Sequence, residues 1–187
     1  KELRLSSIKN RENLKKNYNN ASYQLIKNIA QIKELKKIKI IASFISIKTE
    51  ISTEPLNNYL LSLGKKICLP VIKNNNDLFF RLFNKKNKLK KGMFGILEPN
   101  ENCEALFPEL ILTPCLAFDK YGYRLGYGGG YYDKTFNKYN NIGHSFISVT
   151  VAFDGQRVNN VVNDQNDQKT DYILTEKKIY ITNENSV

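Results

Sequence analysis

The stretch IKIIASFISIKTEISTEPLNNYLLSLGKKICLPVI (38–72) decides the fold. Its first part, IKIIASFISI (38–47), is a continuous apolar run rich in β-branched residues, which predicts a strand buried on both faces. Ser52 or Thr53 then caps a helix that carries proline in its first turn and ends at the next glycine. KICLPVI (66–72) predicts a second strand. Strand, helix and strand in this order indicate a parallel βαβ unit.

The 37 residues before this unit are rich in Lys, Asn, Glu and Leu. Apolar residues recur there at roughly helical spacing, which predicts two amphipathic helices. Asparagine in the segment Tyr18–Asn20 supplies turn and cap chemistry, so we expect the break between the helices there. The second helix is expected to end near Lys36–Lys37.

The residues after this unit continue the alternation of strands and helices. No internal repeat or long linker divides the chain, which predicts a single domain over residues 1–187. The class is α/β, with three layers around a mostly parallel sheet. The further elements expected are strands at 78–83 (short and antiparallel at an edge), 109–119, 145–154, 171–175 and 178–182 (the last two paired), loops at 84–92 and 94–99, and a short helix at 131–139.

The charge balance is strongly basic. Lys plus Arg number 29 against 18 Asp plus Glu, a formal net charge of +11. One interpretation is a binder of nucleic acid or of an anionic ligand. The other is a compositional bias, because the lysines are spread through the chain and form no dense basic tract.

The cysteines and the hydrophobic pattern bear on the compartment. Cys68, Cys103 and Cys115 match no zinc or redox spacing. Cys68 and Cys115 lie in apolar runs, so we expect buried, reduced thiols. No signal peptide and no apolar run near 18 residues is evident, which predicts a cytoplasmic protein that does not bind membranes.

The most unusual stretch is FDKYGYRLGYGGGYYDKTF (118–136), with five glycines within nine positions. Such clustering implies special backbone angles or a backbone that a ligand approaches closely. It lies between a predicted strand and a predicted helix, where open parallel sheets bind ligands. A glycine loop there presents free N–H groups and the positive end of a helix dipole to an anion. The alternative is a flexible surface loop.

Two side chains add chemistry to this loop. Arg124 is suited to a bidentate, charge-assisted contact with phosphate. Asp133, one turn inside the helix, is suited to hold a Mg²⁺ ion that bridges phosphate oxygens. Neither GxxxxGK[ST] nor GxGxxG occurs here. The residues alone therefore predict an anion-binding loop of no common type.

The amino-acid sequence of this loop is nevertheless distinctive. LAFDKYGYRLGYGGGYYD (116–133) closely resembles the signature of the 5-formyltetrahydrofolate cyclo-ligases, also called methenyltetrahydrofolate synthetases. The resemblance extends over nearly the whole chain. Four other segments fall in family order and at family spacing: KELR (1–4), FISIKTEISTEPL (44–56), FGILEP (94–99) and NDQKTDYILTE (166–176).

The resemblance implies a Rossmann-like three-layer α/β/α sandwich whose N-terminal helices (1–37) contribute to the ATP site. The ATP-binding positions that it implies are Lys1, Arg4, Arg124, Leu125, Gly126, Tyr127, Gly128, Gly129, Gly130, Tyr131 and Tyr132. The substrate-binding positions are Ile45, Glu50, Tyr127, Gly128, Gly129, Gly130 and Tyr131. The metal positions for Mg²⁺ are Asp133 and Asp167, and Arg124 also has the catalytic role.

The implied reaction is the ATP-dependent cyclisation of 5-formyltetrahydrofolate to 5,10-methenyltetrahydrofolate, by a monomer without a nucleic-acid partner. The γ-phosphoryl group of ATP passes to the formyl oxygen, N10 attacks the activated carbon, and phosphate leaves. The substrate oxygen is the nucleophile, so no protein nucleophile is needed. Two departures from the family pattern concern the phosphates. Tyr127 stands where many relatives have a basic residue, and Gly129 where some have Lys.

Several alternatives stay open at this point. Glu50 either binds the pterin edge or is a solvated or capping acid near Thr53. Asp119 either orients Arg124 or ends its strand, and Phe94 either walls the folate pocket or anchors a loop. His144, the only histidine, is expected to be non-catalytic. The rival functions are a nucleic-acid-binding domain and another phosphate-ligand enzyme on a Rossmann-like sheet.

Overall fold

The computed structural model describes residues 1–18, 20–72, 77–85 and 88–182. Its main element is an eight-stranded sheet. In spatial order the strands are β12 (Ile179–Ile181), β11 (Tyr172–Leu174), β10 (Ile147–Val151), β7 (Leu110–Pro114), β1 (Ile40–Ala42), β2 (Lys66–Ile72), β3 (Leu78–Leu82) and β6 (Ala105–Leu106). Two small sheets join β4 (Lys90–Lys91) to β5 (Leu97–Glu98) and β8 (Ala117–Phe118) to β9 (Arg124–Leu125).

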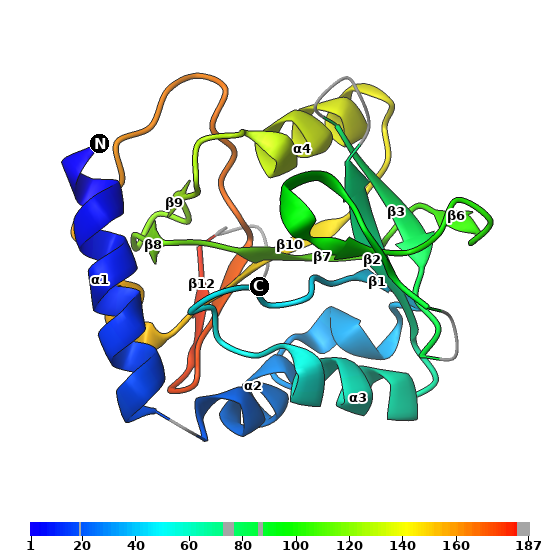
Figure 1. The fold of residues 1–187 in the computed structure, drawn as a ribbon, viewed down its shortest axis with the longest axis horizontal. Helices are drawn as coiled ribbons and strands as arrows, with labels where there is room; N and C mark the ends of the chain where they lie inside the picture. Colours follow the sequence, from blue (N-terminus) through cyan, green and yellow to red (C-terminus); the bar gives the residue numbers. More distant parts are fainter. Residues whose placement is uncertain (19, 73–76, 86–87, 183–187) are drawn as a thin grey trace.

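Helices cover both faces of the main sheet (Figure 1). They are α1 (Glu2–Asn17), α2 (Ala21–Ile29), α3 (Glu54–Ser62) and α4 (Tyr131–Asn141), with 3₁₀ turns η1 (Lys33–Lys36), η2 (Met93–Gly95) and η3 (Asp154–Gln156). Helices α2 and α3 lie on one face, α4 lies on the other, and α1 stands beside β8 and β9. The predicted three-layer α/β architecture is therefore confirmed.

The sheet is mostly parallel, as predicted. Strands β11, β10, β7, β1 and β2 run parallel to one another, and β12, β3 and β6 add antiparallel pairs at the two sides. The βαβ unit is confirmed, since β1 and β2 pair in parallel with Ile40 opposite Lys66. The next strand in sequence, β2, pairs with one side of β1, and the later strand β7 pairs with the other side. This is a topological switch point, and ligands bind beyond the carboxyl ends of such strands.

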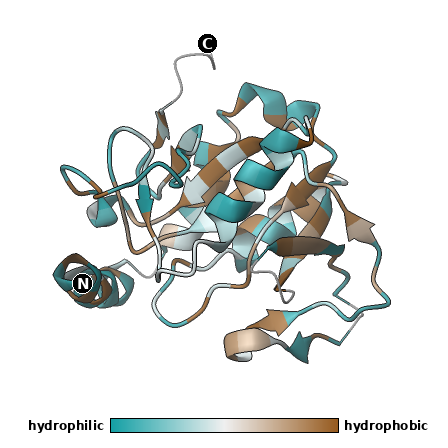
Figure 2. Ribbon diagram, turned by 90° about the horizontal axis from the view of Figure 1, so that it is seen from above, coloured by the Kyte–Doolittle hydropathy of each residue, from teal (hydrophilic) through white to brown (hydrophobic). Residues whose placement is uncertain are grey.

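Apolar side chains fill the space on both sides of the sheet. Leu25 and Ile29 of α2 pack with Leu56 and Leu60 of α3, all fully buried, against the strands. On the opposite face Phe136 belongs to a second buried cluster under α4. Figure 2 shows hydrophobic residues along the central strands and hydrophilic residues on the outer face of α4. This alternation secures α4, and with it the glycine loop that precedes it.

The predicted strand 38–47 is too long. Strand β1 covers three residues, and the Ser43 N–H still donates to the Cys68 carbonyl at 2.9 Å before the chain leaves the sheet. Beyond this point side-chain hydroxyls compete with the ladder. Thr53 Oγ1 donates to the Phe44 carbonyl at 2.6 Å, and Ser46 Oγ donates to the Ile51 carbonyl at 2.8 Å. Such local bonds favour a loop over a strand, so the segment 44–53 forms a loop over the strand ends.

Other boundaries also differ from the prediction. The second helix ends at Ile29 rather than near Lys36–Lys37, because Ile32 is extended and the chain turns into η1. The predicted strand 109–119 splits, since β7 ends at Pro114 and the chain then enters the small β8–β9 sheet. Strand β3 is antiparallel as predicted, but β6 lies outside it.

Two predicted loops also contain regular structure. The predicted loop 84–92 contains β4, although residues 86–87 lie outside the described part of the chain. The predicted loop 94–99 contains β5 and part of η2.

Several local predictions are confirmed. Strand β2 has the predicted bounds, and α4 extends the predicted helix by two residues. Helix α3 begins directly after Thr53, and Gly64, at φ +75°, lies just beyond its end. The Thr53 side chain does not form the predicted cap, because its hydroxyl donates to the Phe44 carbonyl instead. Cys68 and Cys115 are buried and free. Within the described residues, no helix is long and apolar enough to cross a membrane.

Glu109 ties the start of β7 to the start of β1, and this contact makes a testable contribution to stability. Its carboxylate accepts the N–H groups of Lys39 and Ile40 at 2.5 and 3.0 Å, and these bonds lower its pKa below 4.5. A lowered folded pKa contributes stability above pH 4.5 that is lost as the pH falls through the folded value. We expect Glu109→Gln to lower the free energy of unfolding at pH 7 by about 1 kcal/mol.

Urea denaturation at several pH values measures this contribution. The difference between wild type and Glu109→Gln should shrink as the pH falls below 4.5, because the wild-type carboxyl is then protonated too. Glu12→Gln on the exposed side of α1 is the control, with no expected change. A constant difference at all pH values would contradict the assignment.

Candidate functional site

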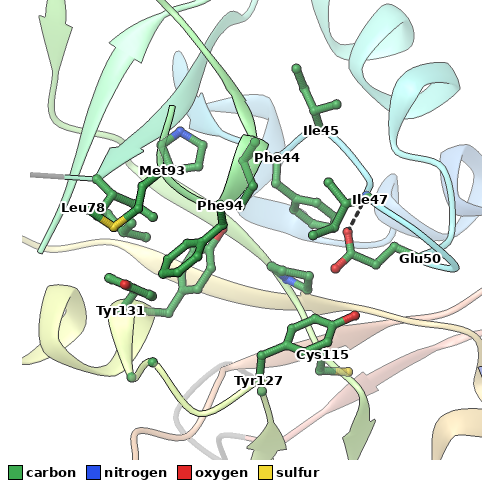
Figure 3. A pocket seen from close by; sticks show the side chains of 18 of the residues that line it. Phe44, Ile45, Ile47, Glu50, Leu78, Met93, Phe94, Cys115, Tyr127 and Tyr131 are labelled. Carbon is green, nitrogen blue, oxygen red and sulfur yellow. Dashed lines mark hydrogen bonds between the residues drawn. The ribbon is translucent and has the colours of Figure 1, made fainter. Parts of the chain in front are cut away.

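A cavity of about 460 Å³ opens at the carboxyl ends of β1 and β7, at the switch point of the sheet. The loop after β1 forms one wall and the glycine loop before α4 forms another. The η2 segment forms a third, where Met93 and Phe94 face Ile47 and Phe44 across the space (Figure 3). A largely apolar cleft with a few convergent polar groups is typical of a small-molecule site.

The glycine loop 126–130 has a backbone that favours glycine. Gly128 has φ +105° and Gly130 has φ +64°, and Gly130 is the N-cap of α4. Most other residues would be strained at these angles. The loop also contacts α1, because Arg4 Nε donates to the Gly126 carbonyl at 3.1 Å. The first turn of α4 and the Arg4 guanidinium thus surround a backbone suited to an anion.

Arg124 and Asp133 form an ion pair at the edge of the cavity. Arg124 Nη2 lies 2.8 Å from Asp133 Oδ1, and the two side chains are 5% and 22% exposed. Gln168 joins them, because its carbonyl accepts from Arg124 Nη1 at 2.7 Å and its N–H donates to Asp133 Oδ1 at 3.0 Å. The guanidinium also stands 5.0 Å from the centre of the Phe136 ring. Arg124 is therefore held rigidly, with its charge beside the glycine loop.

Glu50 is a buried carboxylate on the opposite wall. Its side chain is 6% exposed, its Oε2 accepts the Ile47 N–H at 2.9 Å, and its Oε1 lies 3.7 Å from Arg11 Nη1. Burial raises its pKa above the ordinary 4.5, although the Ile47 N–H and the Arg11 charge oppose the rise. A buried acid with a shifted pKa in a cleft is typical of a functional position.

Comparison with known proteins gives a consistent result. A model of the 5-formyltetrahydrofolate cyclo-ligase family matches residues 1–176. The chain belongs to this family. The 5-formyltetrahydrofolate cyclo-ligase of Haemophilus influenzae is 37% identical over 134 residues, which cover 68% of this chain and 71% of the relative. The enzyme of the same name from Escherichia coli is 30% identical over 146 residues, covering 75% and 79%.

Solved structures show the same fold. The 5,10-methenyltetrahydrofolate synthetase of Aquifex aeolicus superposes with a TM-score of 0.80 at 30% identity, covering 98% of this chain and 92% of that one. The synthetase of Mycoplasma pneumoniae superposes with a TM-score of 0.70 at 18% identity, covering 93% and 96%, and supports the fold alone. Membership in the cyclo-ligase family favours an enzyme over the nucleic-acid-binding alternative.

The structure brings most of the implied family positions together. The residues among them that line the cavity are Ile45, Glu50, Arg124, Gly126, Tyr127, Gly128, Gly129, Gly130, Tyr131, Tyr132 and Asp133. Arg4 lies against the loop from outside. Lys1 is exposed at the start of α1. The Leu125 side chain packs into the cluster between α1 and β8, so only its backbone is near the loop.

Asp167 lies beyond the cavity lining. Its Oδ2 accepts the Asp164 N–H at 2.8 Å, while the next residue, Gln168, bonds to Asp133. The loop that carries Asp167 is thus adjacent to Asp133, but its carboxylate closes its own turn. Among the described residues, no group of three or more His, Cys, Asp or Glu side chains is arranged to hold a metal ion.

The open alternatives for three other residues now have structural answers. Asp119 is fully buried and accepts the N–H groups of Tyr121, Tyr123 and Val161 within 3.1 Å, so it organises the β8–β9 turn. Phe94 lines the cavity and lies edge-on to Tyr131, with the two ring centres 6.3 Å apart. The His144 ring packs among aromatic side chains, with Nε2 2.9 Å from the Pro108 carbonyl, and does not line the cavity.

Two basic residues near the site had no place in the sequence prediction. Lys48 lines the cavity, has φ +53°, and places its Nζ 5.3 Å from the centre of the Tyr127 ring. Arg11 lies behind the cavity wall and is 1% exposed. A helical signal was available for Arg11, because Arg4 and Arg11 are seven residues apart and seven residues make two turns of one helix face.

Proposed function

We propose that the chain catalyses the ATP-dependent cyclisation of 5-formyltetrahydrofolate to 5,10-methenyltetrahydrofolate, with release of ADP and phosphate. The observation that carries the proposal is the single cavity that the buried Glu50 and the glycine loop share, in a member of this family. A carboxylate suits a substrate with paired N–H donors, and a helix-capping glycine loop suits phosphates. The reaction requires both ligands in one cavity.

For the nucleotide, we propose contacts from Lys1, Arg4 and the segment Arg124–Tyr132. The positive φ angles of Gly128 and Gly130, and the placement of Gly130 at the N-cap of α4, support this assignment. Arg4 and Arg124 bring guanidinium groups to the two sides of the loop. The net charge of +11 adds a favourable field for an anionic substrate.

For the folate, we propose the wall that contains Ile45 and Glu50, with the loop residues 127–131 on the other side. Glu50 would accept hydrogen bonds from the N–H groups of the pterin edge. Phe94 and Tyr131 lie on the cavity lining, where their aromatic rings would contact the flat faces of the substrate.

The chemistry then depends on position and charge. The formyl oxygen attacks the γ-phosphorus of ATP and the bond to the bridging oxygen breaks, which gives ADP and an imidate phosphate. N10 next attacks the formyl carbon, the carbon–oxygen bond breaks, and phosphate leaves while N10 loses its proton. Arg124 would stabilise the charge that develops on the transferred group. The apolar walls would exclude water from the activated intermediate.

We further propose that Asp133, with Asp167 nearby, holds a Mg²⁺ ion together with the nucleotide. Asp133 Oδ1 is committed to Arg124 and Gln168, which leaves the second carboxylate oxygen for a ligand role. Mg²⁺ commonly takes one or two carboxylates and completes its shell with phosphate oxygens and water. The ion would offset phosphate charge.

We expect Asp167→Asn to raise the Mg²⁺ concentration for half-maximal activity several-fold, and Asp164→Asn to have a smaller effect. Equal Mg²⁺ dependence in both variants would contradict the role of Asp167.

The proposed function has a direct test. Purified protein is mixed with 5-formyltetrahydrofolate, ATP and Mg²⁺, and the absorbance of methenyltetrahydrofolate is followed. We expect product that depends on all three additions and on enzyme concentration. Omission of ATP, replacement of Mg²⁺ by excess chelator, and heat-treated protein are the controls. Absence of product from folded protein at high concentration would refute the proposal.

A further inference from the structure

Arg11 is the most deeply buried charged side chain next to the cavity, with 1% of its surface exposed. Arginine is rarely buried to this degree unless its donors are paired. Here each branch has a partner. Nε donates to Thr49 Oγ1 at 3.0 Å, Nη1 donates to the Cys115 carbonyl at 2.8 Å, and Nη2 donates to Tyr127 Oη at 2.5 Å. Nη1 also lies 3.7 Å from Glu50 Oε1.

These partners belong to three segments that are far apart in the sequence. Thr49 and Glu50 lie in the loop after β1, Cys115 follows β7, and Tyr127 lies in the glycine loop. Figure 3 shows Glu50, Cys115 and Tyr127 around one side of the cavity. The Arg11 guanidinium therefore connects the proposed folate wall with the proposed phosphate loop from behind. Its planar fork sets the directions of these bonds, which a lysine ammonium would not do.

We propose that Arg11 is a positioning residue for the cyclisation, because it fixes the Glu50 carboxylate relative to Tyr127 and the glycine loop. The inference rests on the proposed function. Transfer of a phosphoryl group requires the formyl oxygen and the γ-phosphorus to meet in line, and small displacements of either partner are costly. A guanidinium bonded to both sides of the cavity would keep the two substrates in register without touching either.

The charge of Arg11 also acts on Glu50. The groups that face this carboxylate are Arg11 and Lys15 from α1, Lys48 from its own loop, the buried Cys115 and the half-buried Tyr132. Cys115 and Tyr132 remain neutral, because desolvation raises the pKa of each. Burial is the largest influence on the pKa of Glu50 and raises it, while the Arg11 charge lowers it. Loss of Arg11 should therefore raise the pKa of Glu50 further and protonate it at higher pH.

The test compares Arg11→Met, Arg11→Lys and the control Lys9→Met, which removes a charge from the exposed side of the same helix. Arg11→Met should lower kcat/KM for 5-formyltetrahydrofolate 10- to 100-fold and shift the acid limb of its pH profile to higher pH. Arg11→Lys should keep the acid limb near its wild-type position but lower kcat, because charge remains while the fork is lost. Lys9→Met should match wild type.

A double variant separates positioning from a general structural role. If Arg11 acts through Glu50, then Arg11→Met combined with Glu50→Gln should lose little more activity than Glu50→Gln alone. Losses that multiply would overturn the inference, as would an unshifted acid limb in folded Arg11→Met.

A second variant decides the case if circular dichroism shows that Arg11→Met does not fold. Tyr127→Phe then removes the hydroxyl that accepts from Arg11, on a half-exposed residue. We expect it to lower kcat about threefold to tenfold with the acid limb in place, and a wild-type kcat would overturn the inference. An inactive wild type would refute the proposed function itself, which distinguishes the two failures.

Discussion

Replacement of Arg124 by alanine is expected to lower kcat/KM for ATP about a thousandfold, through both a higher KM for ATP and a lower kcat. Arg124 lines the cavity beside the glycine loop, and three contacts fix its guanidinium: Asp133, the Gln168 carbonyl and the Phe136 ring. A donor held in advance at the place where charge develops needs no reorganisation during the reaction. Tyr127 stands nearby without a charge, so we expect the chain to depend strongly on Arg124.

The effect must be separated from a loss of structure. Asp133 retains the Gln168 N–H after the substitution, so we expect a folded variant that is destabilised by about 1–3 kcal/mol. Thermal unfolding followed by circular dichroism measures this directly. Arg124→Lys keeps the charge but loses the bidentate geometry, so its kcat/KM for ATP should lie between the values of wild type and Arg124→Ala.

His144→Ala is the matched control for Arg124→Ala, because His144 packs among aromatic rings away from the cavity. We expect near wild-type kcat from it. If His144→Ala abolished turnover of a folded protein while Arg124→Ala retained it, the assignment of roles would be wrong.

The fold was predictable where local signals were strong and unopposed. Strand β2 has the predicted bounds because an apolar run lies between charged or polar residues, and α3 lies between Thr53 and Gly64 as predicted, although the Thr53 side chain does not cap it. The run 38–47 was misjudged because hydrophobicity alone cannot show where Ser46 and Thr53 will bond to the backbone. These hydroxyls become partners only when the segment folds back on itself.

The site was predictable where the glycine pattern requires a special backbone, and it was not predictable where tertiary contacts decide. The glycine cluster is visible in the sequence, and Gly128 and Gly130 adopt the positive φ angles that favour glycine. Arg11 stands in a segment rich in Lys and Asn, where a basic side chain is ordinarily solvated. Its burial results from packing of α1 against the loop after β1 and the glycine loop. The spacing to Arg4 indicates a shared helix face but not the partners on it.

Glu50→Gln is expected to lower kcat/KM for 5-formyltetrahydrofolate about a hundredfold, mostly through KM, with less than about threefold change in the KM for ATP. Glutamine has nearly the same shape, but its amide replaces one acceptor oxygen with a donor that would face Arg11 or the N–H groups of the pterin. The acid limb assigned to Glu50, which should lie above pH 4.5, should disappear from the variant. A persistent limb would assign that titration to another group.

Glu50→Gln should also change stability, with a pH dependence opposite to that of Glu109→Gln. This difference distinguishes a ligand-binding acid from a structural one. Burial raises the folded pKa of Glu50 above 4.5, so the folded state binds this proton more tightly than the unfolded chain. The stability that wild type derives from the proton is then present at low pH and is lost as the pH rises from 4.5 through the folded value. Urea denaturation should therefore show Glu50→Gln gaining stability relative to wild type across this interval. An ionised carboxylate that lowers the stability of the fold is expected where ligand binding requires its charge. A variant that instead lost stability relative to wild type as the pH rose would place Glu50 among the groups that hold the fold together.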